Sequence, residues 1–348
     1  MEQKKVDPYA NESTRIINVP EDYTVSVCSE NLFSSVKLLP LETKEECLIG
    51  RMDRLVICDS LFIINDTRQR ILVFDREGAF LRQIGKRGGG PGEYLEVRDF
   101  FINNKNELEV LDFKKILRYS LTGEFIGDMR FDYLSDKNLY CNPSYFIASP
   151  IAGYYIWGGT TGVRKVEDES CLMYKTDGAM KIEKGYFPIE HGAGANYYKF
   201  SKYDNHILID PTFGDYNIYQ IDTLKKEIFP IIYLDFGEAE IKEDGLPGRA
   251  SGKRTDNDKE RMKIADDFSA RHNFLRESTT HFIPMQTLLS ENYIYIFIVK
   301  GQERYGRHYI YNRVKKKGYL IKIDVPFCMY DCFGIDDNVL LAICQPTE

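Results

Sequence analysis

A hairpin-like segment recurs along this chain, and its spacing restricts the fold more than any other feature. Ile71–Gly85 (ILVFDREGAFLRQIG) matches Ile116–Arg130 (ILRYSLTGEFIGDMR) at an offset of 45 residues without a gap. Gly78 and Gly123 occupy the same place in the two copies, between two strand-like runs. Glycine adopts a positive φ at little steric cost, as tight turns between strands require. The repeat therefore predicts two strands and a tight turn in each copy.

Two weaker copies follow. Leu172–Met180 (LMYKTDGAM) places Gly178 at the position of Gly123 with an offset of 55, and Asn217–Leu224 (NIYQIDTL) lacks the glycine. Two more strand-like runs precede each hairpin, so each unit holds four short antiparallel strands. Those runs are Arg54–Cys58, Leu61–Asn65, Val97–Ile102, Glu107–Asp112, Tyr145–Ala148, Tyr154–Trp157, Tyr198–Ser201 and His206–Ile209. Four-stranded units that recur every 45 to 55 residues are typical of propeller blades.

The remaining chain fits this period once one insertion is removed. A fifth unit runs from His281 to Val325, and a sixth begins at Phe327. The excess before the fifth unit lies in Gly237–Thr279, which is rich in charge. The spacing of its apolar residues predicts a helix from about Asp256 to Leu275. We expect this loop and helix to lie on one face of the disc.

The sixth unit has only two strands before the chain ends. The N-terminal runs Arg15–Val19 and Leu32–Leu39 would supply the missing strands, and would close the ring by removing an open edge. The predicted fold is therefore an all-β, six-bladed β-propeller with four-stranded antiparallel blades. We expect one domain over residues 15–348, with the insertion at 237–279, after a flexible polar tether at residues 1–14.

Composition excludes several classes of protein. The net charge is −7, from 46 Lys and Arg against 53 Asp and Glu. A nucleic-acid binder needs a basic surface, so nucleic acid is not an expected partner. No apolar run is long enough for a transmembrane helix. The eight cysteines are scattered without a CxxC, which favours small buried hydrophobes over a disulfide framework or metal pair. A monomer is expected.

Two glycine-rich stretches suggest phosphate-binding loops. Gly85–Gly92 (GKRGGGPG) is followed by the strand-like run Val97–Ile102, whereas a nucleotide loop requires a helix N-terminus there. A connection between blades is the better interpretation. Gly248–Thr255 (GRASGKRT) has Pro247 and Arg254 where a Walker A element requires Gly and Ser or Thr, so it is rejected.

The histidines form no metal-binding motif, although His191 and His281 fall in or just after blade connections. Calcium prefers hard oxygen ligands. Acidic or amide residues near comparable connections are Glu93, Asp99, Asn196 and Asp235. No cofactor is predicted, and calcium at these residues stays an alternative.

The first two blades resemble a known family. Ile84–Tyr94 (IGKRGGGPGEY), preceded by Val73–Gly78 and followed by Asp99–Phe100, is similar to six-bladed β-propeller proteins abundant in Bacteroidetes, which are more distantly NHL-like. Leu32–Val36 with Pro40–Thr43 resembles that family's first strand. Its members are commonly exported lipoproteins without an established activity. The resemblance implies the fold and an exported, periplasmic or outer-membrane-anchored location, and it implies no catalytic residue.

Two functions stay open. A non-enzymatic binding or scaffold module would take a glycan, peptide or protein at the funnel mouth, because propeller function resides in the face loops. A metal-dependent lactonase or lyase is the alternative, but it needs ligands converging from several blades. The expected ligand contacts come from two connections, Gly85–Arg98 and Tyr186–Tyr197. They are Arg87, Glu93, Tyr94, Arg98, Asp99, His191, Asn196 and Tyr197.

Within this set, Arg98 has two interpretations. Its guanidinium could present a planar fork to a carboxylate or a sugar hydroxyl. It could equally be a structural residue paired with Asp99 or Glu96.

Overall fold

The computed structural model describes residues 14–26, 37–113, 115–131, 139–141, 143–158, 163–165, 171–188, 200–203, 206–210, 215–222, 224–242, 245–247, 257–300, 306–322, 327–336 and 339–346. The chain divides into two compact units, one of residues 35–186 and one of residues 1–34 with 187–348. The prediction of a single domain over 15–348 after a tether stays a prediction, and residues 1–13 lie outside the described part.

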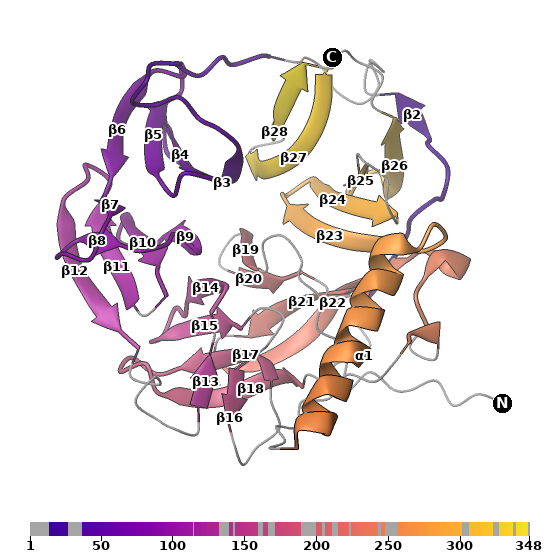
Figure 1. The fold of residues 1–348 in the computed structure, drawn as a ribbon. Coiled ribbons are helices and arrows are strands. Elements are labelled where there is room, and N and C mark those ends of the chain that lie inside the picture. The colour runs from indigo at the N-terminus through magenta and orange to yellow at the C-terminus, as the bar shows by residue number, and fades with distance from the viewer. Residues whose placement is uncertain are drawn as a thin grey trace. The chain divides into compact units, whose positions relative to one another are not determined.

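The unit of residues 35–186 holds three blades (Figure 1). The first comprises β3 (Met52–Cys58), β4 (Leu61–Asp66), β5 (Ile71–Asp75) and β6 (Phe80–Ile84), and the second β9 (Asp99–Ile102), β10 (Glu107–Leu111), β11 (Lys115–Ser120) and β12 (Phe125–Arg130). The third contains β13 (Leu139–Cys141), β14 (Tyr145–Ala148), β15 (Tyr154–Trp157), β16 (Val163–Lys165), β17 (Cys171–Thr176) and β18 (Ile182–Pro188). A short parallel pair, β7 (Lys86–Arg87) and β8 (Glu93–Tyr94), lies between the first two blades in sequence.

The second unit holds two more blades and a hairpin. One blade comprises β19 (Phe200–Tyr203), β20 (His206–Ile209), β21 (Asn217–Asp222) and β22 (Glu227–Asp235). The next comprises β23 (Phe282–Leu289), β24 (Tyr293–Lys300), β25 (Arg307–Asn312) and β26 (Lys317–Lys322). The C-terminal strands β27 (Phe327–Asp336) and β28 (Val339–Pro346) pair only with each other in the described residues (Figure 1). The all-β propeller class with four-stranded antiparallel blades is confirmed.

The number of blades was predicted wrongly. The described residues form five blades of four or more strands, not six, because the N-terminal strands do not join the C-terminal hairpin. Instead β1 (Arg15–Asn18) adds in parallel to β22, and β2 (Val25–Ser26) adds in parallel to β26. Of the other predicted closing strand, residues 32–36 lie outside the described part and residues 37–39 are not in a strand.

The hairpin turns of the first three blades share one geometry. In each turn, a residue with a positive φ donates its N–H to the carbonyl of the residue three positions earlier, which begins the turn. The left-handed residues are Gly78 (φ 86°), Gly123 (φ 97°) and Met180 (φ 65°). Assigning Gly178 to this place was therefore wrong by two residues. The third turn begins at Asp177, whose carboxylate accepts the N–H groups of the residues two and four positions on.

The apolar core lies between neighbouring blades. Ile63, Val73 and Ile84 of the first blade pack in one cluster with Phe100 and Val110 of the second, and all five are fully buried. Such close packing gives each blade pair a large, non-directional stabilisation. The alternation of apolar residues that identified the strands thus also identified the core.

The predicted insertion helix is confirmed as α1 (Asp258–Glu277), after a short 3₁₀ turn η4 (Gly237–Ala239). The Asn257 side chain caps α1 by accepting the N–H of Lys259, and two acidic residues in the first turn favour the positive end of the helix dipole. Phe274 packs against the core of the β23–β26 blade. The side chains of Ile264, Phe268 and Leu275 lie outside the described part. Coverage of a propeller face by this insertion stays a prediction.

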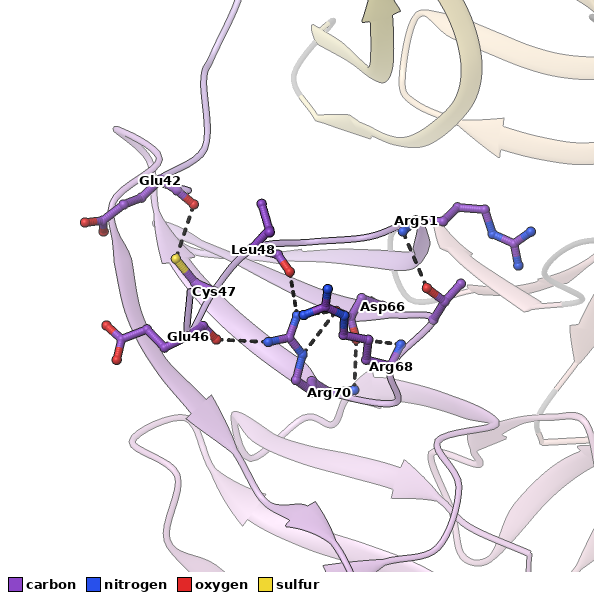
Figure 2. Close-up of polar contacts among 9 residues, drawn as sticks. Glu42, Glu46, Cys47, Leu48, Arg51, Asp66, Arg68 and Arg70 are labelled. Carbon is purple, nitrogen blue, oxygen red and sulfur yellow. Dashed lines mark hydrogen bonds and ion pairs between the residues drawn. The ribbon is translucent and has the colours of Figure 1, made fainter. Parts of the chain in front are cut away.

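Arg70 helps to fasten the segment before β3 to the first blade (Figure 2). Buried Asp66 accepts the Nε and Nη2 groups of Arg70 at 3.2 and 2.6 Å. The same guanidinium donates to the carbonyls of Glu46 (3.0 Å) and Leu48 (2.7 Å). A planar fork with several fixed donors suits such a multiple contact.

The two turn glycines give a matched test of how this segment packs. A Cβ at Gly78 would collide with the carbonyl oxygen of Pro40, whereas a Cβ at Gly123 would meet nothing closer than 3.9 Å. Both substitutions to Ala carry the cost of a left-handed residue, about 1–2 kcal/mol. We expect Gly78→Ala to lower the free energy of unfolding by about 2 kcal/mol more than Gly123→Ala in denaturant titrations. Equal losses would show that the Pro40 contact is dispensable.

Candidate functional site

The connection between β6 and β9 folds around its own acidic residue. The carboxylate of Glu93 accepts the N–H of Gly90 at 2.8 Å and pairs with Lys86 at 3.0 Å. These two contacts, the backbone N–H first, lower the pKa of Glu93. A Cβ at Gly88 would collide with this carboxylate. The glycine-rich loop therefore packs closely around the carboxylate of its own Glu93.

Tyr94 closes the base of the same connection. Its side chain is fully buried, and burial raises its pKa to about 12. A Cβ at Gly85 would come within 2.7 Å of its ring, so the glycine at that bend is required. Tyr119 donates to the carbonyl of Gly92 at 2.9 Å from the neighbouring blade. Tyr94 is thus a core residue, and its role as a ligand contact stays a prediction.

Arg98 lies in a surface built from two loops. Buried Asp112 joins them, because its carboxylate accepts the N–H groups of Leu95 and Glu96, both at 3.2 Å, and of Phe113 at 2.7 Å. The Arg98 guanidinium lies 4.8 Å from the Phe113 ring centroid. We call Leu95, Glu96, Arg98 and Phe113 the Arg98 surface.

The Arg98 surface is held rigidly and partly exposed. Arg98 donates to Glu96 at 3.1 Å and to the carbonyl of Pro143, just before β14, at 2.8 Å. Its own side chain is only 15% exposed, whereas Leu95 is 56% and Phe113 39% exposed. The interpretation of Arg98 as a structural partner of Glu96 is therefore supported by its contacts, and the exposed contact area comes from its apolar neighbours.

Asp99 joins the edge strands β3, β9 and β14 of three blades. Its carboxylate forms an ion pair with Arg54 of β3 and accepts the N–H of Phe146 of β14 at 2.9 Å, as well as that of Phe100 at 2.8 Å. Burial raises the pKa of Asp99 to about 6, against the lowering effects of Arg54 and of the two backbone N–H groups. This group acts as a structural clasp between blades.

The structure brings together only part of the predicted contact set. Arg87 is exposed in β7, Glu93 and Tyr94 belong to the glycine-rich loop, and Arg98 and Asp99 point to different partners. The other three predicted residues, His191, Asn196 and Tyr197, lie outside the described part of the chain.

Sequence reasoning missed three residues that organise this region. Arg54, Asp112 and Phe113 each contact the predicted set. Asp112 had one available signal, because it follows a buried strand in the position that Asp66 holds in the first blade. Arg54 had none, since a single arginine in a strand does not name its partner.

The alternative calcium ligands have partners within the protein. Glu93 and Asp99 make the contacts above, Asp235 accepts the N–H of Gly237 at 2.9 Å, and Asn196 lies outside the described part. His281 Nδ1 lies 2.6 Å from the Ser278 hydroxyl. Among the described residues, no group of three or more His, Cys, Asp or Glu side chains could hold a metal ion.

Comparison with known proteins places the chain in a family. Residues 14–348 match the model of a family described as Domain of unknown function (DUF4934). The chain belongs to this family. No curated protein matches the chain.

Solved structures share the fold. A protein of Bacteroides fragilis NCTC 9343, described as a candidate exported protein, is 19% identical over 94% of this chain and 88% of its own, with a TM-score of 0.72. A DUF4221 family member from Bacteroides vulgatus is 13% identical over 87% and 89%, with a TM-score of 0.53. At these identities the likeness shows the propeller fold alone. No helix in the described part of this DUF4934 protein is long and apolar enough to span a membrane.

The raised pKa of Asp99 predicts a pH dependence that Asp99→Asn removes. In the unfolded chain the carboxyl loses its proton near 3.8, whereas in the folded protein it keeps it until about 6. The stability contributed by protonation is therefore complete below pH 4 and is lost as the pH rises through 6. The difference in unfolding free energy between the wild type and Asp99→Asn should shrink by up to about 3 kcal/mol from pH 4 to pH 7. A difference that grows over this range would mean that the Arg54 ion pair outweighs burial.

Proposed function

We propose that this DUF4934 protein is a non-enzymatic binding or scaffold propeller of the cell envelope. The Arg98 surface is the part that contacts its ligand. The supporting observation is that the buried Asp112 carboxylate holds two loops together. The exposed Leu95 side chain, the exposed Phe113 ring and the Arg98–Glu96 ion pair therefore lie on one surface.

The chemistry of this surface fits a glycan or an extended peptide. Leu95 and Phe113 offer apolar area, which can pack on the C–H face of a sugar ring or on an aliphatic side chain. Glu96, with a side chain that is 51% exposed, offers acceptors for hydroxyl or amide groups. Arg98 fixes the orientation of both Glu96 and Phe113, so little conformational entropy is lost when a ligand binds.

An exported location, periplasmic or anchored at the outer membrane, is part of the same proposal. It draws on the description of the Bacteroides fragilis neighbour as a candidate exported protein.

Matched substitutions test the proposal. A glycan array and a peptide library would identify a ligand for the purified full chain. Phe113→Ala and Leu95→Ala should each weaken the binding of that ligand by about tenfold or more, because a few side chains at a binding surface carry most of the binding energy. The melting temperature should stay within about 3 °C of the wild type, since both side chains are largely exposed.

Controls of the same type lie elsewhere in this unit. Phe125→Ala and Leu81→Ala remove side chains that are 40% and 41% exposed on the outer strands β12 and β6. Neither should change affinity. A ligand whose binding is lowered by these controls, and left unchanged by Phe113→Ala, would place the site elsewhere.

A further inference from the structure

The N-terminal strap, Thr14–Ser26, occupies the outer edges of two neighbouring blades. Its strand β1 runs parallel to β22, and hydrogen bonds extend the pairing at both ends. The hydroxyl of Thr14 donates to the carbonyl of Pro230 at 3.0 Å, and the N–H of Val19 donates to the carbonyl of Asp235 at 2.8 Å. The first half of the strap is thus bound along its whole length.

The second half of the strap is bound to the next blade. Thr24 donates its N–H to the carbonyl of Leu320 at 2.8 Å, and its hydroxyl accepts the Leu320 N–H at 2.8 Å. Between the two strands of the strap, Arg307 donates to the carbonyl of Glu21 at 2.7 Å and lies 5.2 Å from the Tyr23 ring centroid. One arginine of β25 therefore clamps the turn of the strap.

Two aliphatic side chains anchor the strap in the core. Ile17 is 1% and Val19 6% exposed, and both belong to the cluster that contains Leu234 of β22 and Ile296 of β24. Ile16, which precedes Ile17 in β1, is 65% exposed, and Asn18 between the two anchors is exposed as well. The strap thus presents the alternating pattern of a half-buried strand, and its recognition requires aliphatic residues two positions apart.

These observations describe a strand-acceptor site. A sheet edge offers unpaired N–H and carbonyl groups to any extended segment, and main-chain hydrogen bonds with side-chain pockets then give affinity and specificity. The strap is a short chain segment with two buried anchors, and parallel pairing is slightly weaker per residue than antiparallel pairing. A strand held at a sheet edge through one side, by these hydrogen bonds and two buried side chains, opens locally before the inner strands of the blades do.

We propose that the edges of β22 and β26 also accept the strap of a second copy of this chain, so that two copies join by reciprocal exchange. Exchange of an identical element costs little, because every contact of the closed monomer is regained in the dimer. At low concentration the attached strap prevails through its high effective concentration. At high concentration, exchange between copies becomes favourable.

A labelled peptide of residues 14–26 tests the acceptor on the full chain. In Ile17→Asp protein the attached strap loses its main anchor, so the peptide should bind saturably in fluorescence anisotropy and raise the melting temperature. Binding to the wild type should be at least about tenfold weaker, because the attached strap competes. A peptide carrying Ile17→Asp should not bind. Absence of peptide binding to the folded variant would overturn the acceptor site.

Two further variants keep this experiment decisive. Ile16→Asp alters the exposed neighbour, and should leave both melting and peptide binding as in the wild type. If Ile17→Asp does not fold, Thr24→Val replaces it, because it weakens only the attached strap by removing the hydroxyl that accepts the Leu320 N–H at 2.8 Å. Peptide binding to Thr24→Val that is no tighter than to the wild type would then count against the proposal.

Light scattering after size exclusion tests the second copy as occupant. Wild-type protein concentrated and incubated a few degrees below its melting temperature should form a dimer, and excess peptide should suppress it. The Ile17→Asp protein should form much less dimer. A wild type that stays monomeric at every concentration, although the peptide binds, would overturn exchange and assign the acceptor to an extended segment of another protein.

Discussion

One buried carboxylate, that of Asp99, connects the edge strands β3, β9 and β14 of three consecutive blades. Neighbouring blades share apolar packing, but the described ladders of hydrogen bonds run within each blade. Apolar packing is non-directional, so it does not by itself fix how one blade is placed against the next. The Asp99 carboxylate pairs with Arg54 on one side and accepts the Phe146 N–H on the other. Because these contacts are directional, they fix how the neighbouring blades are placed. Removing one partner of such a pair costs about 3–5 kcal/mol, because an uncompensated charge remains.

The other unit uses the same device. The carboxylate of Asp210, which follows β20, accepts the N–H of Thr287 in the next blade at 3.2 Å. Asp210 and Asp99 are both 2% exposed. Two acidic side chains at different positions in their blades therefore serve one purpose, the connection to the inner strand of the following blade.

The local elements could be predicted from the sequence, and the pairings beyond one hairpin could not. The blade strands follow from alternating apolar residues and turn glycines, which act over a few residues. The partner of Arg15–Asn18 depends on which of several sheet edges is open, and that is a long-range property without a local pattern. The third turn shows a further limit, because Met180 adopts the left-handed conformation although Gly178 lies nearby.

The candidate site shows the same division. Tyr94 and Glu93 were predicted as ligand contacts because they follow a glycine-rich loop. In the structure the glycines of this loop pack against these two side chains. Glycine was required there by the close approach of the Glu93 carboxylate and of the Tyr94 ring. The sequence marks such a close approach clearly, but it does not say whether a ligand or the chain itself approaches. The exposed pair Leu95 and Phe113 carries no such mark, since it is defined by the fold.

The outer edges of the blades are protected from pairing with other chains in different ways. The outer strands β6 and β12 carry Arg82, Asp128 and Arg130, and irregularities in register interrupt their pairing with β5 and β11. Charges and bulges of this kind discourage pairing with another chain. The outer strand β22 (EIFPIIYLD) has charged residues only at its two ends, although it also holds Pro230 and a register irregularity against β21. Its edge is paired with β1, which satisfies N–H and carbonyl groups that would otherwise be open to another chain.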